Sequence, residues 1–115
     1  MESERDIEAW LRTQIEGLGG LFLKFVSPGA DGVPDRIAIF PDGRVVFVEL
    51  KTATGKLSAI QDYQIRKLME HHQQVCVVYG MEGARDFMAD MRALMVSSVV
   101  YDNGESWLME GCDAL

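Results

Sequence analysis

The sequence is poor in cysteine and has no long apolar run. Cys76 lies inside the apolar run VCVVY and Cys112 lies near the C-terminus. Neither their number nor their spacing fits a disulfide framework or a zinc site, so we expect two reduced thiols. The first ten residues, MESERDIEAW, are acidic and lack the apolar stretch of a signal peptide, and nowhere do about 18 apolar residues follow one another. These absences predict a soluble, cytoplasmic protein with no membrane partner.

The chain is too short for more than one hydrophobic core. Its 115 residues, 48% of them hydrophobic and 25% charged, suffice for one ordinary globular domain. We find no internal repeat, linker or low-complexity segment. We therefore expect a single domain over residues 1–115, with a core over about 4–80 and a C-terminal helix and tail over 81–115.

Basic residues are in the minority, which at first argues against a nucleic-acid partner. Eleven Lys and Arg stand against 18 Asp and Glu, whereas binding to phosphates depends mainly on Lys and Arg. The imbalance is uneven: residues 1–80 hold nine basic and eleven acidic residues, a charge of −2, and residues 81–115 hold two and seven, a charge of −5. Divalent cations held by carboxylates would reverse the local field. Net charge therefore does not exclude DNA.

Apolar periodicity and turn residues predict the secondary structure. Helices are expected over 3–18, from the possible N-cap Ser58 to about His72, and over about 81–95, where Met residues share one face. Strands are expected at 21–26, in both arms of a hairpin over 35–51, and in the buried run QVCVVYG. Residues 97–111 form either a short hairpin turning at Asn103-Gly104 or an irregular tail. The order αβββαβα predicts an α/β fold with a mixed central sheet flanked by helices.

The hairpin brings charged residues together. The segment PDG at 41–43 suits a three-residue loop, and counting outward from it places Asp35 opposite Glu49. Because side chains alternate between the faces of a strand, Lys51 projects from the same face at the same end. Two opposed carboxylates repel each other, so this arrangement is costly unless a cation lies between them.

Carboxylate oxygens of this kind suit Mg²⁺ or Mn²⁺, which bind proteins through one or two carboxylates together with water and phosphate. Such an ion polarises a phosphodiester, and Lys51 could orient or deprotonate the attacking water or neutralise charge on the phosphate. Alone, a Pro-Asp turn at Asp35 or a solvated strand end at Glu49 is more often only structural. Their coincidence on one face favours a nuclease.

These residues also carry a family resemblance. PD at 34–35 and ELK at 49–51 match the PD-(D/E)xK nuclease signature, and the wider string KFVSPGADGVPDR…GRVVFVELK…LSAIQ resembles the virus-type replication-repair nuclease (VRR-Nuc) family. The resemblance spans about Glu4 to Tyr79. It implies a restriction-endonuclease-like αβββαβ core and Mg²⁺- or Mn²⁺-dependent endonuclease activity on DNA.

Stand-alone members of this family resemble archaeal Holliday-junction resolvases. The resemblance therefore implies a structure-selective hydrolase that acts as a homodimer on branched DNA such as a four-way junction, in DNA repair. It also implies a bacterial or phage-encoded protein that works in the host cytoplasm. A nuclease on flaps, nicks or linear duplex is the alternative, as is a non-cleaving DNA-binding module of the same fold. The intact acidic pair favours cleavage.

The residues that match the family's motif are the candidate site residues. The resemblance implies that Asp35, Glu49 and the carbonyl oxygen of Leu50 bind the metal and that Lys51 is the catalytic lysine. Gln61 matches the glutamine of the next helix, where it positions the lysine or a phosphate unless it is merely an exposed helix residue.

The family also places an acid on the first helix, and two are available. Glu4 falls within the apolar stripe of that helix, where a carboxylate needs a reason, so it is preferred as catalytic residue and ligand. Glu8 lies at the edge of the stripe and is held in reserve. Either could simply interact with the helix dipole.

The first strand returns antiparallel to the first helix, so the loop that follows this strand should lie near the start of the helix. This placement makes four residues candidate phosphate contacts, although each is more often an ordinary surface residue: Lys24, Ser27, Arg36 and Lys56. His71 and His72 at a helix end more often satisfy the last carbonyl groups than take part in catalysis. The Met-rich third helix is either ordinary core or a dimer face.

Overall fold

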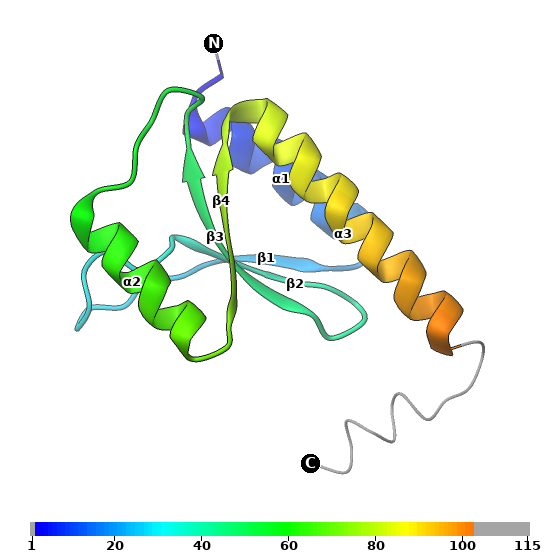
Figure 1. Ribbon diagram of the computed structural model, residues 1–115. Helices are drawn as coiled ribbons and strands as arrows, with labels where there is room; N and C mark the ends of the chain where they lie inside the picture. Colours follow the sequence, from blue (N-terminus) through cyan, green and yellow to red (C-terminus); the bar gives the residue numbers. More distant parts are fainter. Residues whose placement is uncertain (1, 103–115) are drawn as a thin grey trace.

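The computed structural model describes the backbone of residues 2–102 and the side chains of residues 2–95. Its helices and strands follow the predicted order (Figure 1). The elements are α1 (Glu4–Gly17), β1 (Leu21–Lys24), β2 (Arg36–Ile39), β3 (Val45–Lys51), α2 (Ala59–Glu70), β4 (Gln74–Tyr79) and α3 (Gly80–Asp102). The αβββαβ core with a mixed sheet is therefore confirmed. None of the described helices combines the length and the apolar character needed to cross a membrane.

The sheet has the strand order β1-β2-β3-β4. The first three strands form an antiparallel meander, and β4 pairs with β3 in parallel. Ile37 lies opposite Phe47 and Ile39 opposite Val45, which is the register predicted from the loop at 41–43. A one-residue slip would have moved every side chain of a strand to the other face, so this register decides which residues meet at the end of the hairpin.

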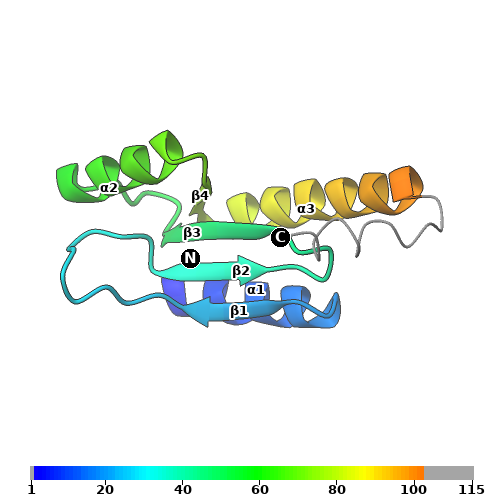
Figure 2. The same cartoon turned by 90° about the horizontal axis from the view of Figure 1, so that it is seen from below.

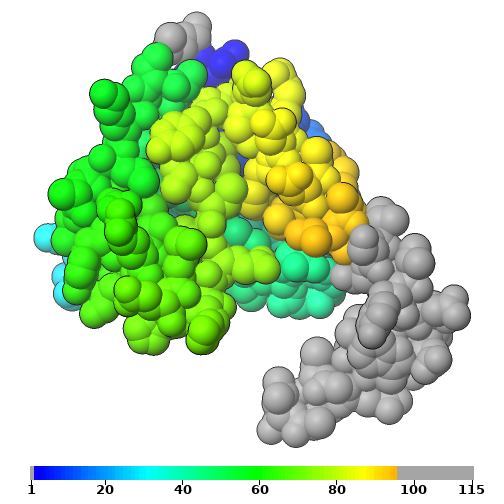
Figure 3. Space-filling model, in the orientation of Figure 1, coloured from blue at the N-terminus to red at the C-terminus, as the bar shows by residue number. Residues whose placement is uncertain are grey.

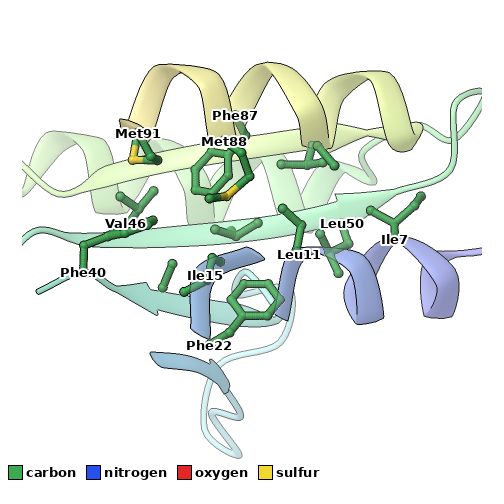
Figure 4. Packing of buried hydrophobic residues seen from close by; sticks show 14 residues of the cluster. Ile7, Leu11, Ile15, Phe22, Phe40, Val46, Leu50, Phe87, Met88 and Met91 are labelled. Carbon is green, nitrogen blue, oxygen red and sulfur yellow. The ribbon is translucent and has the colours of Figure 1, made fainter. Parts of the chain in front are cut away.

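One face of the sheet carries the hydrophobic core. Ile7, Leu11 and Ile15 of α1 pack there with residues of the sheet and of α3 (Figure 4). Met88 is fully buried and Met91 is 8% exposed. Over these residues, the Met-rich segment of α3 is therefore part of the hydrophobic core, which was one of its two expected roles.

The run QVCVVYG contains the expected strand, β4, but the expectation that this strand is buried is wrong. In β4 only Val78 is buried, and Gln74 and Tyr79 are exposed. The reason is topological, since β4 is an edge strand with a neighbour on one side only. Figure 3 shows its yellow-green surface between the green α2 and the yellow α3.

The helix α2 stands apart from the main core and holds the loop that leads into β2. Its buried residue, Ile65, does not belong to the core cluster. Gln64 donates a hydrogen bond to the main-chain oxygen of Asp31 at 3.0 Å. Gly32 has φ +85°, and a Cβ atom there would lie 2.9 Å from the backbone of Ile60. Only glycine combines this conformation with so close an approach, so the loop is fixed just before Asp35.

The helix α3 continues to Asp102. Residues 97–102 are therefore helical, and the expectation of a hairpin arm or irregular tail over them is wrong. A helical segment satisfies its own backbone hydrogen bonds and needs no partner strand. The expected turn at Asn103-Gly104 and Cys112 lie outside the described residues.

Candidate active site

Asp35 and the end of β3 come together as the hairpin register predicts. Asp35 directly precedes β2, and its main-chain oxygen accepts a hydrogen bond from the backbone N–H of Phe25 at 2.9 Å, which prolongs the pairing of β1 with β2. The backbone N–H of Leu50 donates to Oδ1 of Asp35 at 3.4 Å. The Asp35 carboxylate therefore reaches across to the last residues of β3, where Glu49 and Lys51 lie.

Glu49 is the buried charged residue of the described chain, with 4% exposure. Its Oε2 accepts a hydrogen bond from Nε2 of Gln61 at 3.2 Å and lies 3.7 Å from Nζ of Lys51. Both neighbours approach the same oxygen. The end of β3 at Glu49 is thus not solvated. The interpretation of the ELK segment as an ordinary solvated strand end is therefore wrong.

Gln61 has a more defined position than the sequence indicated. Its Oε1 accepts from the backbone N–H of Ser58 at 2.9 Å, and its own backbone N–H donates to Oγ of Ser58 at 3.2 Å. This capping box starts α2 and at the same time aims the side-chain amide of Gln61 at Glu49. The hydrogen bond of this amide is with Glu49, whose Oε2 also lies near Lys51.

Burial and like charge act together on the two acids. Burial and, to a lesser extent, the charge of Asp35 raise the pKa of Glu49 from 4.5 to about 7, against the opposing effect of Lys51. Burial also raises the pKa of Asp35, against the opposing charge of Arg36. Glu4 lies near enough to raise both pKa values. Two carboxylates in this environment do not both ionise readily near neutral pH without a compensating cation.

The donor set fits a hard divalent cation. The Asp35 and Glu49 carboxylates and the Leu50 carbonyl are oxygen ligands of the type that Mg²⁺ and Mn²⁺ prefer. Among the side chains of residues 2–95, no three from Asp, Glu, His or Cys gather closely enough to hold a metal ion by themselves. This is compatible with an ion such as Mg²⁺, which usually keeps several water ligands and uses one or two carboxylates.

The placement of Glu4 on the buried face of α1 is wrong, because Glu4 is exposed. Burial on this helix begins at Ile7, and the first turn borders an open cleft instead of the sheet. The cleft has a volume of about 320 Å³. Its lining joins the start of α1 to the acidic pair and consists of Glu4, Arg5, Glu8, Arg12, Asp35, Arg36 and Leu50.

Glu8, the reserve candidate on α1, is engaged by two guanidinium groups. Its Oε2 lies 2.5 Å from Nη2 of Arg12 and 3.3 Å from Nε of Arg36. Burial alone would raise the pKa of Glu8, but hydrogen bonds and charge from these arginines hold it below its usual value. Glu8 is therefore an ionised partner of arginines. The sequence analysis missed Arg12, although its position four residues after Glu8 was a possible signal.

The candidate phosphate contacts differ in exposure. Lys24 and Lys56 are exposed, whereas Ser27 and Arg36 are half-buried. Arg36 also donates from Nη1 to the main-chain oxygen of Asp35 at 2.9 Å. His71, in contrast, lies at the end of α2 with Nδ1 2.7 Å from the carbonyl oxygen of Lys67, as expected for a residue that satisfies a helix end.

Comparison with known proteins gives two informative likenesses. No family model matches the chain. The chain is 39% identical over 75 residues to "Putative nuclease p44" of Acyrthosiphon pisum secondary endosymbiont phage 1, which covers 65% of this chain and 81% of that protein. Its fold is similar to a solved VRR_NUC domain, with a TM-score of 0.71 and 26% identity over 75% of this chain and 94% of that one.

A slighter likeness is to Hjc, a Holliday junction resolvase from Archaeoglobus fulgidus. It has a TM-score of 0.46 and 18% identity and covers 63% of each chain. A likeness of this size carries no argument about function.

We predict that the metal-free protein loses stability as the pH rises from about 5 to 8 because of Glu49. The pKa of Glu49 is 4.5 in the unfolded chain and about 7 in the native state, so between these values the native state binds a proton that the unfolded chain has lost. The stabilisation from this protonation is complete below pH 4.5 and is lost as the pH rises through about 7. The loss amounts to up to about 3 kcal/mol. Urea unfolding in the presence of a chelator measures it.

Glu49→Gln is the matched control, since it keeps the shape of the side chain and removes the titration. Its free energy of unfolding should vary less between these pH values than that of the wild type. Parallel pH curves for the two proteins would contradict the prediction.

Proposed function

Because this chain belongs to the VRR-Nuc (virus-type replication-repair nuclease) family, we propose that it is a metal-dependent endonuclease that hydrolyses phosphodiester bonds in DNA. The observation that carries the proposal is the buried Glu49, whose pKa is raised by burial and by Asp35 while Lys51 lies 3.7 Å from its Oε2. A protein that only bound DNA would have no evident need for so costly an arrangement.

The carboxylates of Asp35 and Glu49 and the carbonyl oxygen of Leu50 would hold Mg²⁺ or Mn²⁺. When bound, the ion supplies polarisation of the phosphodiester and stabilisation of charge on the departing oxygen. Glu4, across the cleft, would act on the same ion through water, which agrees with its exposed position and with its influence on both pKa values.

The other side chains of the site would orient the reacting groups and neutralise the charge of the phosphates. Lys51 places an ammonium group beside the acidic pair, where it would orient the attacking water or neutralise charge that develops on the phosphate. Gln61 keeps the Glu49 carboxylate in place through its hydrogen bond to Oε2. The exposed Lys24 and Lys56, with Ser27, would contact phosphates along the backbone of the DNA.

Branched DNA, such as a four-way junction, is the proposed substrate. The proposal rests on the resemblance of stand-alone family members to junction resolvases. Cutting two strands of a junction requires two sites in a fixed relation, which a twofold symmetric dimer supplies. Cleavage of flaps, nicks or linear duplex is the alternative within the same chemistry.

Cleavage assays on a synthetic four-way junction and a matched linear duplex test this function. The wild type should cut only with Mg²⁺ or Mn²⁺ and should prefer the junction. Asp35→Asn and Lys51→Ala should each lower kcat/KM by at least about 100-fold, since each removes charge that acts on the reacting phosphate. Glu4→Gln should lower it less.

Arg66→Ala is the control for these variants. Arg66 is exposed on α2 and, among the described residues, pairs only with Asp62 of the same helix, so its loss should leave cleavage unchanged. Metal-independent cleavage, or full activity in Asp35→Asn, would refute the proposed chemistry. Binding of the junction without any cutting by the wild type would identify a non-cleaving module instead.

An apolar face of the sheet supports a homodimer. Leu21, Leu23 and Val45 are 53%, 45% and 39% exposed, although all three belong to strands. Their register partners Ile37 and Ile39, and Phe47 opposite Ile37, project from the same face. In Figure 2, α1 lies behind β1 and β2, and no labelled helix lies in front of β1, β2 or β3. The face continues along β3 to Glu49, so a second copy packed there would lie next to the proposed site.

Sedimentation analysis tests this dimer. We expect the wild type to be dimeric and Leu23→Glu to be monomeric with a nearly unchanged melting temperature, because a charge on this face disfavours apolar contact between two copies. Met69→Glu, at a residue of α2 that is 58% exposed, is the control and should remain dimeric. A monomeric wild type would exclude the dimer.

A further inference from the structure

The carboxylate of Glu8 is the centre of a network that joins α1 to the first two strands. Its Oε2 accepts from Arg12 at 2.5 Å and from Arg36 at 3.3 Å. Arg12 also donates from Nη1 to the main-chain oxygen of Phe22 in β1 at 2.7 Å. The side chains of Glu8 and Arg36 are each 18% exposed. At this level of burial, charge-assisted hydrogen bonds are stronger than on an open surface.

The network ends on the backbone of Asp35. The main-chain oxygen of this residue accepts two hydrogen bonds, from Nη1 of Arg36 and from the N–H of Phe25, each at 2.9 Å. Asp35 lies just before β2, where the bond from Phe25 continues the pairing with β1 and the bond from Arg36 is an additional restraint. The two donors therefore restrain the backbone of Asp35, and with it the direction in which the carboxylate projects.

The geometry of Arg36 uses the fork of the guanidinium group. Nε binds a carboxylate on α1 while Nη1 binds a carbonyl in the chain just before β2. A lysine ammonium at the same position has no comparable planar fork and cannot reproduce both contacts. Glu8 and Asp35 engage two of the five N–H donors of Arg36, and its side chain is only 18% exposed, so it is less accessible to a phosphate than the exposed Lys24 and Lys56.

We propose that Glu8 and Arg36 are a positioning pair for the Asp35 carboxylate, and that Arg36 is not a phosphate contact. The inference rests on the proposed nuclease function, since it is the ion and the phosphate at Asp35 that would respond to a misplaced carboxylate. Glu8 accordingly acts through Arg36 and is not a metal ligand. Partners that orient a ligand in this manner typically affect metal affinity or activity by about 10- to 100-fold.

The test compares Arg36→Lys, Arg36→Ala and Glu8→Gln with the wild type in two assays. Calorimetric titration with Mn²⁺ in the absence of DNA should show about 10- to 100-fold weaker binding in all three variants. On junction DNA with Mn²⁺ at saturation, kcat should fall while KM stays unchanged. Arg36→Lys should be nearly as impaired as Arg36→Ala, because the fork and not the charge is required.

A third assay separates positioning from phosphate binding. The salt dependence of DNA binding, measured in a chelator so that no cleavage occurs, should be unchanged in Arg36→Ala. Lys24→Ala is the comparison and should weaken binding with a salt slope reduced by about one phosphate contact. The double variant Glu8→Gln/Arg36→Lys should be no worse than its worse single variant, because both changes break one network.

The inference would be overturned if Arg36→Lys kept the wild-type kcat and Mn²⁺ affinity while Arg36→Ala showed a raised KM and a reduced salt slope. The proposed function would then remain intact. A wild type that binds Mn²⁺ but cuts no DNA would refute the proposed function, while the Mn²⁺ affinities would still decide the role of the pair. A wild type that binds no Mn²⁺ overturns both. If Arg36→Ala does not fold, Arg36→Lys and Glu8→Gln decide the result.

Discussion

The placement of one buried carboxylate, Glu49, beside a second one, Asp35, is the constraint on which this molecule depends. Burial and like charge raise the pKa of Glu49 to about 7, so the metal-free site holds its charges at a cost in stability. Lys51 offsets only part of that cost, at 3.7 Å. A divalent cation would reverse the sign of the interaction, turning mutual repulsion into coordination, and this is why we connect the buried acid with metal-dependent chemistry.

Several parts of the scaffold converge on these two acids. The hairpin register sets Asp35 against the end of β3, and the Gly32 approach to α2 fixes the loop before it. The capping box of α2 aims Gln61 at Glu49, so one residue both starts a helix and orients a ligand. On the other side, α1 contributes the network through Glu8. The proposed site is therefore held by α1, α2 and the sheet together, which limits the movement of the carboxylates that would bind the metal.

The sequence predicted what depends on local rules. The loop at 41–43 and the alternation of side chains determine the hairpin register, and Ser58 marks the start of α2, so these were confirmed. Features that depend on distant neighbours were not predictable. The exposure of Glu4 follows from an open cleft, and the partial exposure of β4 follows from its edge position. The contact of Glu8 with Arg36 joins residues far apart in the chain, and helical periodicity carries no information about it.

The most direct test of the central claim is a calorimetric Mn²⁺ titration at pH 7, repeated in buffers with different ionisation enthalpies. Because the pKa of Glu49 is raised to about 7, binding of the ion to the ionised carboxylate should release a measurable fraction of a proton per chain. Glu49→Gln should bind the ion far more weakly and release no such proton. Equal affinity and equal proton release in the two proteins would show that the buried acid does not hold the ion, and would contradict the account.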